Sequence, residues 1–264
     1  MPQLDLTGSH LEYQWIGPAP SAAPTLVFLH EGLGSVSTWR DFPEHVARRT
    51  GLGVLVYSRL GHGASAPYPR PRPVDFMHRE ALDVLPRVLA ALGVHTPILL
   101  GHSDGASIAL IHAGAAHPVR GLILEAPHVF VEDLTVESIA RLRRRYDRDA
   151  EFRERMARHH RGDEGVGMGA DALVHGWTDV WLSPEFRAWN IEAYVPPIDC
   201  PVLLIQGEDD EYGTVRQIDA VRAALRGPVE TLLLAPCGHA PHRDRPAEVL
   251  DRVARWVTLL GSSR

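Results

Sequence analysis

One pattern recurs along this chain and restricts its fold more than any other feature. A short apolar run is followed by a turn, often with glycine, and then by a helical segment. Runs suited to strands occupy residues 25–30, 54–57, 97–100, 121–125, 202–205 and 230–234, and those at 25–30 and 54–57 suit strands buried on both faces. Neighbouring parallel strands need a crossover of a dozen or more residues, so this alternation predicts βαβ units. We therefore expect an α/β fold with a mostly parallel sheet and helices on both faces.

Residues 3–16 follow a different pattern, because Leu11, Tyr13 and Trp15 alternate with polar residues. A turn at residues 7–9 divides this stretch into two short segments. The pattern is typical of an antiparallel hairpin at the edge of a sheet. Together with the six apolar runs, it predicts a sheet of about eight strands.

A helix of about 12 residues is expected after the turn at residues 31–35, with Trp39, Phe42 and Val46 on one face. The proline-rich residues 67–73 form a connector. Further helices are predicted at residues 76–92, 214–225 and 246–260. Another helix, rich in small residues, is predicted after residue 105 and ends at residue 116. The helix at residues 246–260 is amphipathic, but packing onto its own sheet explains that face, so the sequence indicates no oligomeric state.

The alternation stops at residues 132–197, which are helical and carry dense charges of both signs. Trp177, Trp181, Phe186 and Trp189 follow in the second half of this segment and need something to cover them. We expect a helical cap here, inserted into a core made of residues 1–131 and 198–264. The tryptophans either line an apolar site or form the core of the cap itself.

All 27 basic residues are arginines, and the chain has no lysine. This excludes Schiff-base chemistry, a serine-lysine dyad and a P-loop, all of which require an ε-amine. The net charge of −6 argues against a nucleic-acid partner.

No apolar stretch approaches the length of a membrane helix, and the N-terminal residues do not resemble a signal peptide. We therefore expect a cytoplasmic protein without a membrane partner. The two cysteines, Cys200 and Cys237, are expected at opposite ends of neighbouring strands, too far apart for a disulfide.

The first chemical motif is G-x-S-x-G at residues 101–105, between the apolar run 97–100 and a helix rich in small residues. A serine in such a strand-to-helix turn is held in a strained backbone that exposes its hydroxyl. The pattern predicts that Ser103 is a nucleophile.

His239 follows the last apolar run through Gly238 and is the best candidate for the base that activates Ser103. His242, three residues further on, is the alternative base. The two histidines would also suit a metal, but no third ligand is evident, so we expect neither a metal nor another cofactor.

An acid is needed to orient the imidazole, and an acidic loop follows the run at residues 202–205. Glu208, Asp209 and Asp210 all compete for this role. Glu125, at the end of the strand after the nucleophile helix, is the alternative.

These motifs, in this order, resemble the α/β-hydrolase superfamily over residues 27–260. By this resemblance Ser103 matches the nucleophile, and His239 matches the base in a G-H-x-P pattern. The family's G-x-x-D pattern selects Asp210 as the acid. Its H-G-x loop corresponds to residues 30–32, which implies that the backbone N–H groups of Gly32 and Asp104 bind the oxyanion.

Three residues depart from the family pattern. Glu31 replaces the usual glycine, Asp104 follows the nucleophile, and Ser58 stands where the family often has aspartate. The two carboxylates either pair with arginine, for which Arg59 is a candidate, or with backbone, or they make the pocket electronegative. The loss of aspartate at Ser58 is expected to cost a structural hydrogen bond.

The resemblance implies an α/β-hydrolase fold and a hydrolase that acts through an acyl-enzyme. A carboxylic ester of a small-molecule acyl substrate is the first expectation, and a C–C bond, thioester or lactone is the alternative. A ligand-binding protein with slow turnover would use the same residues. Glu31, His128, Trp177 and Trp181 are the candidates for lining the substrate pocket.

Overall fold

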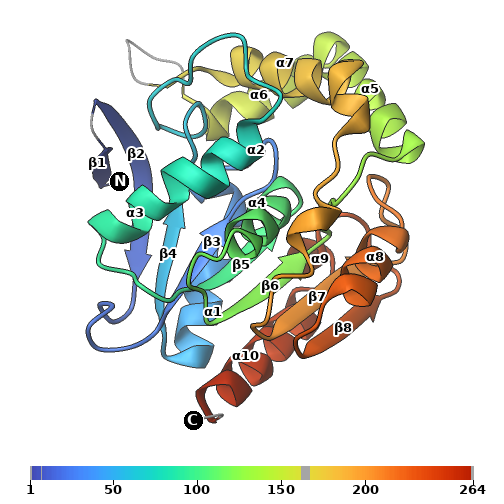
Figure 1. Cartoon of the computed structure of the whole chain (residues 1–264). Helices are drawn as coiled ribbons and strands as arrows, with labels where there is room; N and C mark the ends of the chain where they lie inside the picture. Colours follow the sequence, from blue (N-terminus) through green and yellow to red (C-terminus); the bar gives the residue numbers. More distant parts are fainter. Residues whose placement is uncertain (1, 7, 162–166, 263–264) are drawn as a thin grey trace.

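The computed structural model describes residues 2–6, 8–161 and 167–262, and it places an eight-stranded sheet at the centre of the chain (Figure 1). The strand order is β1-β2-β4-β3-β5-β6-β7-β8. Only the pairings of β1 with β2 and of β2 with β4 are antiparallel in the described sheet. The expected α/β fold and edge hairpin are therefore confirmed. The strands are β1 (Gln3–Leu6), β2 (Ser9–Ile16), β3 (Thr25–Leu29), β4 (Gly53–Tyr57), β5 (Ile98–His102), β6 (Gly121–Glu125), β7 (Val202–Gly207) and β8 (Val229–Leu234).

Helices cover both faces of the sheet and bury two apolar cores. On one face, α1 (Phe42–Thr50) packs beside α10 (Pro246–Ser262). The other face carries α2 (Phe76–Arg79), the π-helical turn η2 (Glu80–Val84), α3 (Leu85–Ala91), α4 (Asp104–Gly114) and α8 (Arg216–Ala224). The strands between the helices are buried along their whole length from β3 to β7, which explains their continuous apolar runs.

The prediction of a single helix after residue 35 is wrong. The chain forms a 3-10 turn, η1 (Val36–Trp39), and then starts α1 at Phe42. Arg40 between them adopts a φ of 54°, which no continuous helix allows. Pro43 explains the break, because it lacks an N–H and is tolerated only in the first turn of a helix.

The described residues of the segment 132–197, which we call the inserted segment, lie over the carboxyl ends of the strands (Figure 1). The segment folds as α5 (Asp133–Arg148), α6 (Ala150–His159), α7 (Ala170–Trp181) and the 3-10 turns η3 (Glu185–Ala188) and η4 (Glu192–Tyr194). Trp181 packs against Phe186 and Trp189, with ring centroids 4.8 and 6.0 Å away. These rings pack together within the segment, and Trp181 and Phe186 also belong to the larger apolar core beside the sheet.

Two further properties concern membranes and thiols. In the described ranges, no helix has both the length and the apolar character required to cross a bilayer. Cys200 and Cys237 are both free thiols.

Candidate active site

Ser103 occupies a tight turn between β5 and α4, at the carboxyl edge of the sheet. Its φ of 55° is rare for a residue with a side chain, so the backbone here is strained. The flanking glycines are required, because a Cβ on Gly101 would overlap the carbonyl oxygen of Gly105, and one on Gly105 would overlap that of Leu29. The G-x-S-x-G sequence thus folds into a turn that presents the Ser103 hydroxyl.

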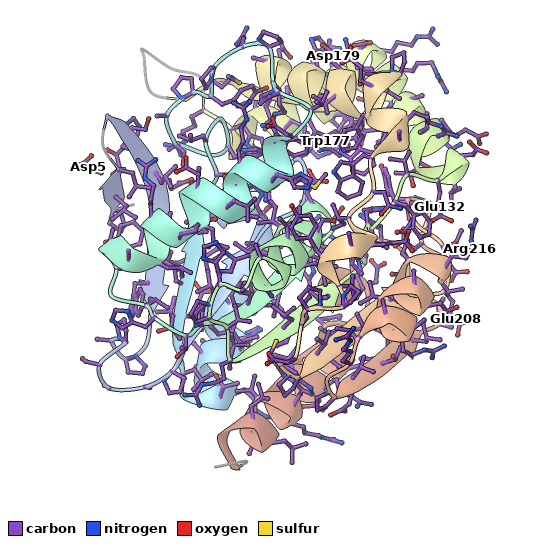
Figure 2. The ribbon with its side chains drawn as sticks, in the orientation of Figure 1. Asp5, Glu132, Trp177, Asp179, Glu208 and Arg216 are labelled. Atoms are coloured by element: carbon purple, nitrogen blue, oxygen red, sulfur yellow. The ribbon has the colours of Figure 1, made fainter. Side chains whose placement is uncertain are left out.

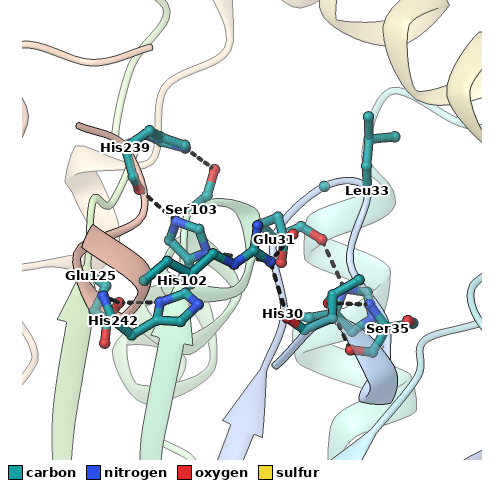
Figure 3. Close-up of polar contacts among 12 residues, drawn as sticks. His30, Glu31, Leu33, Ser35, His102, Ser103, Glu125, His239 and His242 are labelled. Atoms are coloured by element: carbon teal, nitrogen blue, oxygen red, sulfur yellow. Dashed lines mark hydrogen bonds and ion pairs between the residues drawn. The ribbon is translucent and has the colours of Figure 1, made fainter. Parts of the chain in front are cut away.

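His239 reaches Ser103 from the loop between β8 and the short helix α9 (Pro241–Asp244). Its Nε2 lies 2.9 Å from the Ser103 Oγ (Figure 3). The His239 side chain is 14% exposed, so the imidazole borders open space. A hydroxyl and an imidazole at this distance have the arrangement of a nucleophile and its base.

Asp210 holds the other side of the His239 ring, with both carboxylate oxygens 2.8 Å from Nδ1. Gln206 Nε2 and the backbone N–H groups of Tyr212 and Gly213 also donate to this carboxylate. Burial would raise the pKa of Asp210, but the His239 ring and these donors lower it below its usual value. Asp210 therefore stays ionised and fixes the proton of His239 on Nδ1.

The other acids considered in the sequence analysis do not reach His239. Glu125 lies 2.7 Å from Nδ1 of His242 in a second, fully buried pair (Figure 3). Asp209 accepts the backbone N–H of Cys237, and Glu208 is exposed at the surface (Figure 2). His242, the alternative base, is buried against Glu125 instead of facing Ser103.

Glu31 is paired, but not with the expected Arg59. Its carboxylate lies 3.3 Å from the Arg243 guanidinium and 3.8 Å from Nδ1 of His102. Burial would raise the pKa of Glu31, but the His102 and Arg243 side chains bring it well below its usual value. Arg59 donates to the backbone carbonyls of His30 and Glu31 instead.

Asp104 also has a partner that the sequence analysis did not identify. The indole N–H of Trp177, on α7 of the inserted segment, donates to its carboxyl over 2.8 Å. Trp177 lies on the side of α7 that faces the sheet, whereas Asp179 on the same helix points away from it (Figure 2). Burial raises the pKa of Asp104 above its usual value. The contact ties the inserted segment to the residue after the proposed nucleophile.

The carboxylate that Ser58 lacks in place of aspartate is supplied by a residue of another strand. The Ser58 hydroxyl donates to the Glu12 carboxylate and accepts the backbone N–H of Val36. Glu12 Oε2 also accepts the backbone N–H of Ala64. Glu12 on β2 therefore supplies a carboxylate beside Ser58, and the expected loss of a hydrogen bond is made good.

A cavity of about 440 Å³ is bounded by Ser103 and by residues of the inserted segment. Glu31, His128, Trp177 and Trp181, the four candidates for the substrate pocket, all line it. Trp181 thus serves both roles considered for the tryptophans, since it also packs against the other rings of the inserted segment.

Gly32 and Asp104 are placed where the oxyanion hole is expected. Gly32 lines the cavity, and a Cβ there would overlap the Trp177 indole. Asp104 is the first residue of α4, so its N–H belongs to the group at a helix start that has no intrahelical acceptor. Both N–H groups remain candidates for binding an oxyanion.

His128 lies under the same cavity, with its ring centroid 5.6 Å from that of His239 and 5.5 Å from that of Trp181. Burial lowers the pKa of His128 to about 3. The side chain is therefore neutral at physiological pH and adds a polar ring without charge.

The sequence analysis missed several residues that line the cavity. Phe152 and Met156 on α6 stand four residues apart in a charged helix, and this spacing on one face could have identified them. Leu33 and Tyr212 enter from loops, and Arg243 enters from the short helix α9; no local pattern gives a signal for them. Within residues 2–6, 8–161 and 167–262, no group of three or more His, Cys, Asp or Glu side chains could hold a metal ion.

Known proteins match most of this chain in sequence. The profile of the Alpha/beta hydrolase family matches residues 26–252. The chain is similar to serine hydrolase BPHL of Homo sapiens, with 27% identity over 257 residues that cover 94% of this chain and 83% of that protein. A 113-residue stretch is 32% identical to proline iminopeptidase of Lactobacillus delbrueckii subsp. lactis, covering 42% of this chain and 38% of that protein.

Solved structures show the same fold. A carboxylesterase of the thaumarchaeon Nitrososphaera gargenis superposes with a TM-score of 0.76 at 19% identity, covering 100% of both chains. The enol-lactonase of Burkholderia xenovorans LB400 gives a TM-score of 0.74 at 20% identity, covering 97% of this chain and 100% of that one. At these identities the likeness concerns the fold alone.

Proposed function

The chain belongs to the alpha/beta hydrolase family and is a hydrolase, and from this premise we propose that it cleaves small to medium carboxylic esters through an acyl-enzyme. The observation that carries the proposal is the continuous contact from Asp210 to His239 to Ser103, over 2.8 and 2.9 Å. In this proposal Ser103 is the nucleophile, His239 the general base and acid, and Asp210 the residue that orients the imidazole.

The first half-reaction transfers the acyl group to the enzyme. Ser103 Oγ attacks the ester carbonyl carbon while its proton passes to Nε2 of His239. Asp210 stabilises the imidazolium that forms. The N–H groups of Gly32 and Asp104 bind the negative oxygen of the tetrahedral intermediate. Collapse of the intermediate breaks the bond to the alkoxy oxygen, which takes the proton from His239 and leaves as the alcohol.

The second half-reaction restores the enzyme. Water attacks the acyl carbon of the Ser103 ester and gives its proton to His239. The second tetrahedral intermediate then breaks at Ser103 Oγ, which recovers the proton and releases the carboxylic acid. No other reactant is consumed, so the three side chains and the two backbone N–H groups account for the whole cycle.

The cavity supports a small-molecule acyl substrate with an apolar part. Trp177, Trp181, Leu33 and Phe152 supply apolar walls, and its volume of about 440 Å³ lies in the range of small-ligand sites, roughly 300 to 1,000 Å³. We propose that the inserted segment acts as a cap over this cavity, because three of these walls come from it.

A lactone, thioester or C–C bond is the alternative substrate for the same three side chains. The similarity in fold to an enol-lactonase supports keeping lactones in the test. A ligand-binding protein with slow turnover is the alternative of another class.

The two free thiols fit a reducing compartment, and we propose that the protein acts in the cytoplasm without a nucleic-acid or membrane partner.

The test measures steady-state hydrolysis of p-nitrophenyl acetate and butyrate by wild type, Ser103→Ala and Asp210→Asn. We expect Ser103→Ala and Asp210→Asn to lose on the order of 10⁴-fold in kcat. Glu125→Gln is the matched control, because Glu125 contacts His242 and not His239, and it should stay within about tenfold of wild type.

Turnover that survives in Ser103→Ala would contradict the mechanism. Thermal stabilisation by ester analogues without any turnover in the wild type would favour the binding protein. A panel with a δ-lactone, a butyryl thioester and a vinylogous 1,5-diketone then compares kcat/KM between bond types, and faster cleavage of one of these than of the esters would replace the ester proposal.

A further inference from the structure

A second cavity, of about 260 Å³, lies beside the catalytic one, between the segment 59–73 and the helical turns that start at Phe76. In the described part of the chain the two cavities share no lining residue. Leu60, Phe76 and Val84 give the second cavity apolar walls. Nothing in the proposed hydrolysis uses it.

Arg72 lines this cavity and is 8% exposed. The central carbon of its guanidinium lies 4.2 Å from the centre of the Tyr68 ring and 5.0 Å from that of Phe76, so two aromatic rings hold it in place. Its Nε is buried and has no hydrogen-bond partner among the described residues. No carboxylate of the described ranges forms an ion pair with it. A fixed, buried donor group therefore faces the cavity without an anion.

Arg59, the second buried cation of the cavity, is 3% exposed. Its hydrogen bonds go to the backbone carbonyls of His30 and Glu31, which are neutral acceptors, and it forms no ion pair with a carboxylate of the described residues. Burying charge in this way is costly unless a counter-ion is present.

The nearby acids have other hydrogen-bond or ion-pair partners. Glu80 lines the cavity, but burial raises its pKa and the Tyr57 hydroxyl donates to it over 2.7 Å. At the rim, Asp83 pairs with Arg87. Asp104 is close enough to sense both arginines, but its carboxyl is engaged by Trp177 and its pKa is raised. Three arginines, Arg59, Arg72 and Arg79, line the cavity with two acids, Glu80 and Asp83, so its lining carries an excess of positive charge.

We propose that this second cavity binds a small organic carboxylate, with the carboxylate on the Arg72 guanidinium and its apolar body against Leu60, Phe76 and Val84. The planar fork of a guanidinium matches a carboxylate with two parallel hydrogen bonds. The volume is below the roughly 300 Å³ at which drug-sized ligand sites begin, so the ligand is small. The site is independent of Ser103 and goes beyond the proposed hydrolysis.

The test is isothermal titration calorimetry of the full chain with phenylacetate, and with phenylacetamide as its uncharged counterpart. We expect phenylacetate to bind at least tenfold more tightly than phenylacetamide. Arg72→Gln should weaken phenylacetate binding at least tenfold. Arg70→Gln is the matched control, because Arg70 is exposed two residues away and does not line this cavity; its affinity should equal that of wild type.

Two results would overturn the proposal. Equal affinity of Arg72→Gln and wild type would place the carboxylate elsewhere, for example in the catalytic cavity. Equal affinity for inorganic phosphate and phenylacetate would remove the role of the apolar walls. Should Arg72→Gln not fold, as judged by circular dichroism, Arg72→Lys keeps the charge but loses the fork, and an affinity equal to wild type would overturn the role of the guanidinium.

Discussion

Nε2 of His102 lies 2.7 Å from the backbone carbonyl oxygen of His239. Because a carbonyl can only accept, this nitrogen carries a proton and donates it. Burial would lower the pKa of His102, but the Glu31 carboxylate 3.8 Å from its Nδ1 raises it above its usual value. The residue before the proposed nucleophile thus holds the loop that carries the proposed base (Figure 3).

Replacing His102 with phenylalanine should lower kcat by roughly 10- to 100-fold with little change in KM, because small misplacements of a base have effects of this size. His102→Gln can still donate to the His239 carbonyl and should recover most of the loss. Steady-state kinetics on one p-nitrophenyl ester measures both. A purely structural role of His102 would instead lower the melting temperature of both variants and leave kcat of the folded fraction unchanged.

Glu31→Gln should shift the charge preference of the catalytic cavity. The substitution leaves Arg243 without its carboxylate partner and makes the cavity more positive. We expect KM for p-nitrophenyl hemisuccinate, an anion, to fall several-fold, while KM for neutral p-nitrophenyl acetate stays within about twofold. The comparison is made at low and high ionic strength, since salt should weaken the shift. An unchanged ratio of the two KM values would show that Glu31 does not set substrate charge.

The contact between Trp177 and Asp104 should couple the inserted segment to α4. Trp177→Phe leaves the buried Asp104 carboxyl without its donor, which we expect to cost about 1 to 3 kcal/mol of unfolding free energy. Asp104→Asn and the double variant complete a cycle measured by urea unfolding. Additive effects in this cycle would contradict the coupling.

Acid should destabilise the protein between pH 6.5 and 4. Burial lowers the pKa of His128 to about 3, and of His112 and His160 to about 4. In the unfolded chain these residues take up protons near pH 6.5, whereas the folded chain binds them only below 4, so unfolding is favoured as pH falls through this window. Each histidine accounts for up to about 3 kcal/mol of unfolding free energy.

His112→Gln isolates one of these contributions at a residue that lines neither of the two cavities. Its unfolding free energy should fall less steeply with acid than that of wild type, by up to about 1.4 kcal/mol per pH unit. Urea unfolding at pH 7.5, 6 and 5 gives both slopes. His102 acts in the opposite direction, because its raised pKa adds stability at low pH that is lost as pH rises through the folded value. Parallel curves for the two proteins would refute the assignment to His112.

The fold and the roles of Ser103 and His239 could be predicted from local sequence, whereas the choice of Asp210 among its acidic neighbours required the resemblance to the α/β-hydrolase superfamily. Ser103 and Asp210 follow strands that are buried throughout, and His239 follows the partly exposed edge strand β8. Parallel strands bring such positions to one edge of the sheet. Their mutual contacts then follow from the order of the strands.

The partners of the residues that depart from the family pattern could not be predicted, because these partners come from distant segments. Glu12 reaches Ser58 from 46 residues away, and Arg243 reaches Glu31 from 212 residues away. No periodicity or motif connects such positions. The break at Arg40 was missed for another reason, since Pro43 is compatible with a helix only at its start, and the apolar spacing around it gave no sign of where that start lies.

The proposed nucleophile and base are 136 residues apart in sequence and meet only because β8 pairs with β7 at the far edge of the sheet. A chain that ends before β8 still contains the strained turn of Ser103, but it lacks the imidazole that would activate it. In the proposed mechanism the nucleophile is therefore translated before its base, and hydrolysis requires the last strand to join the sheet. Enzyme activity is accordingly a direct reporter of the completeness of the fold.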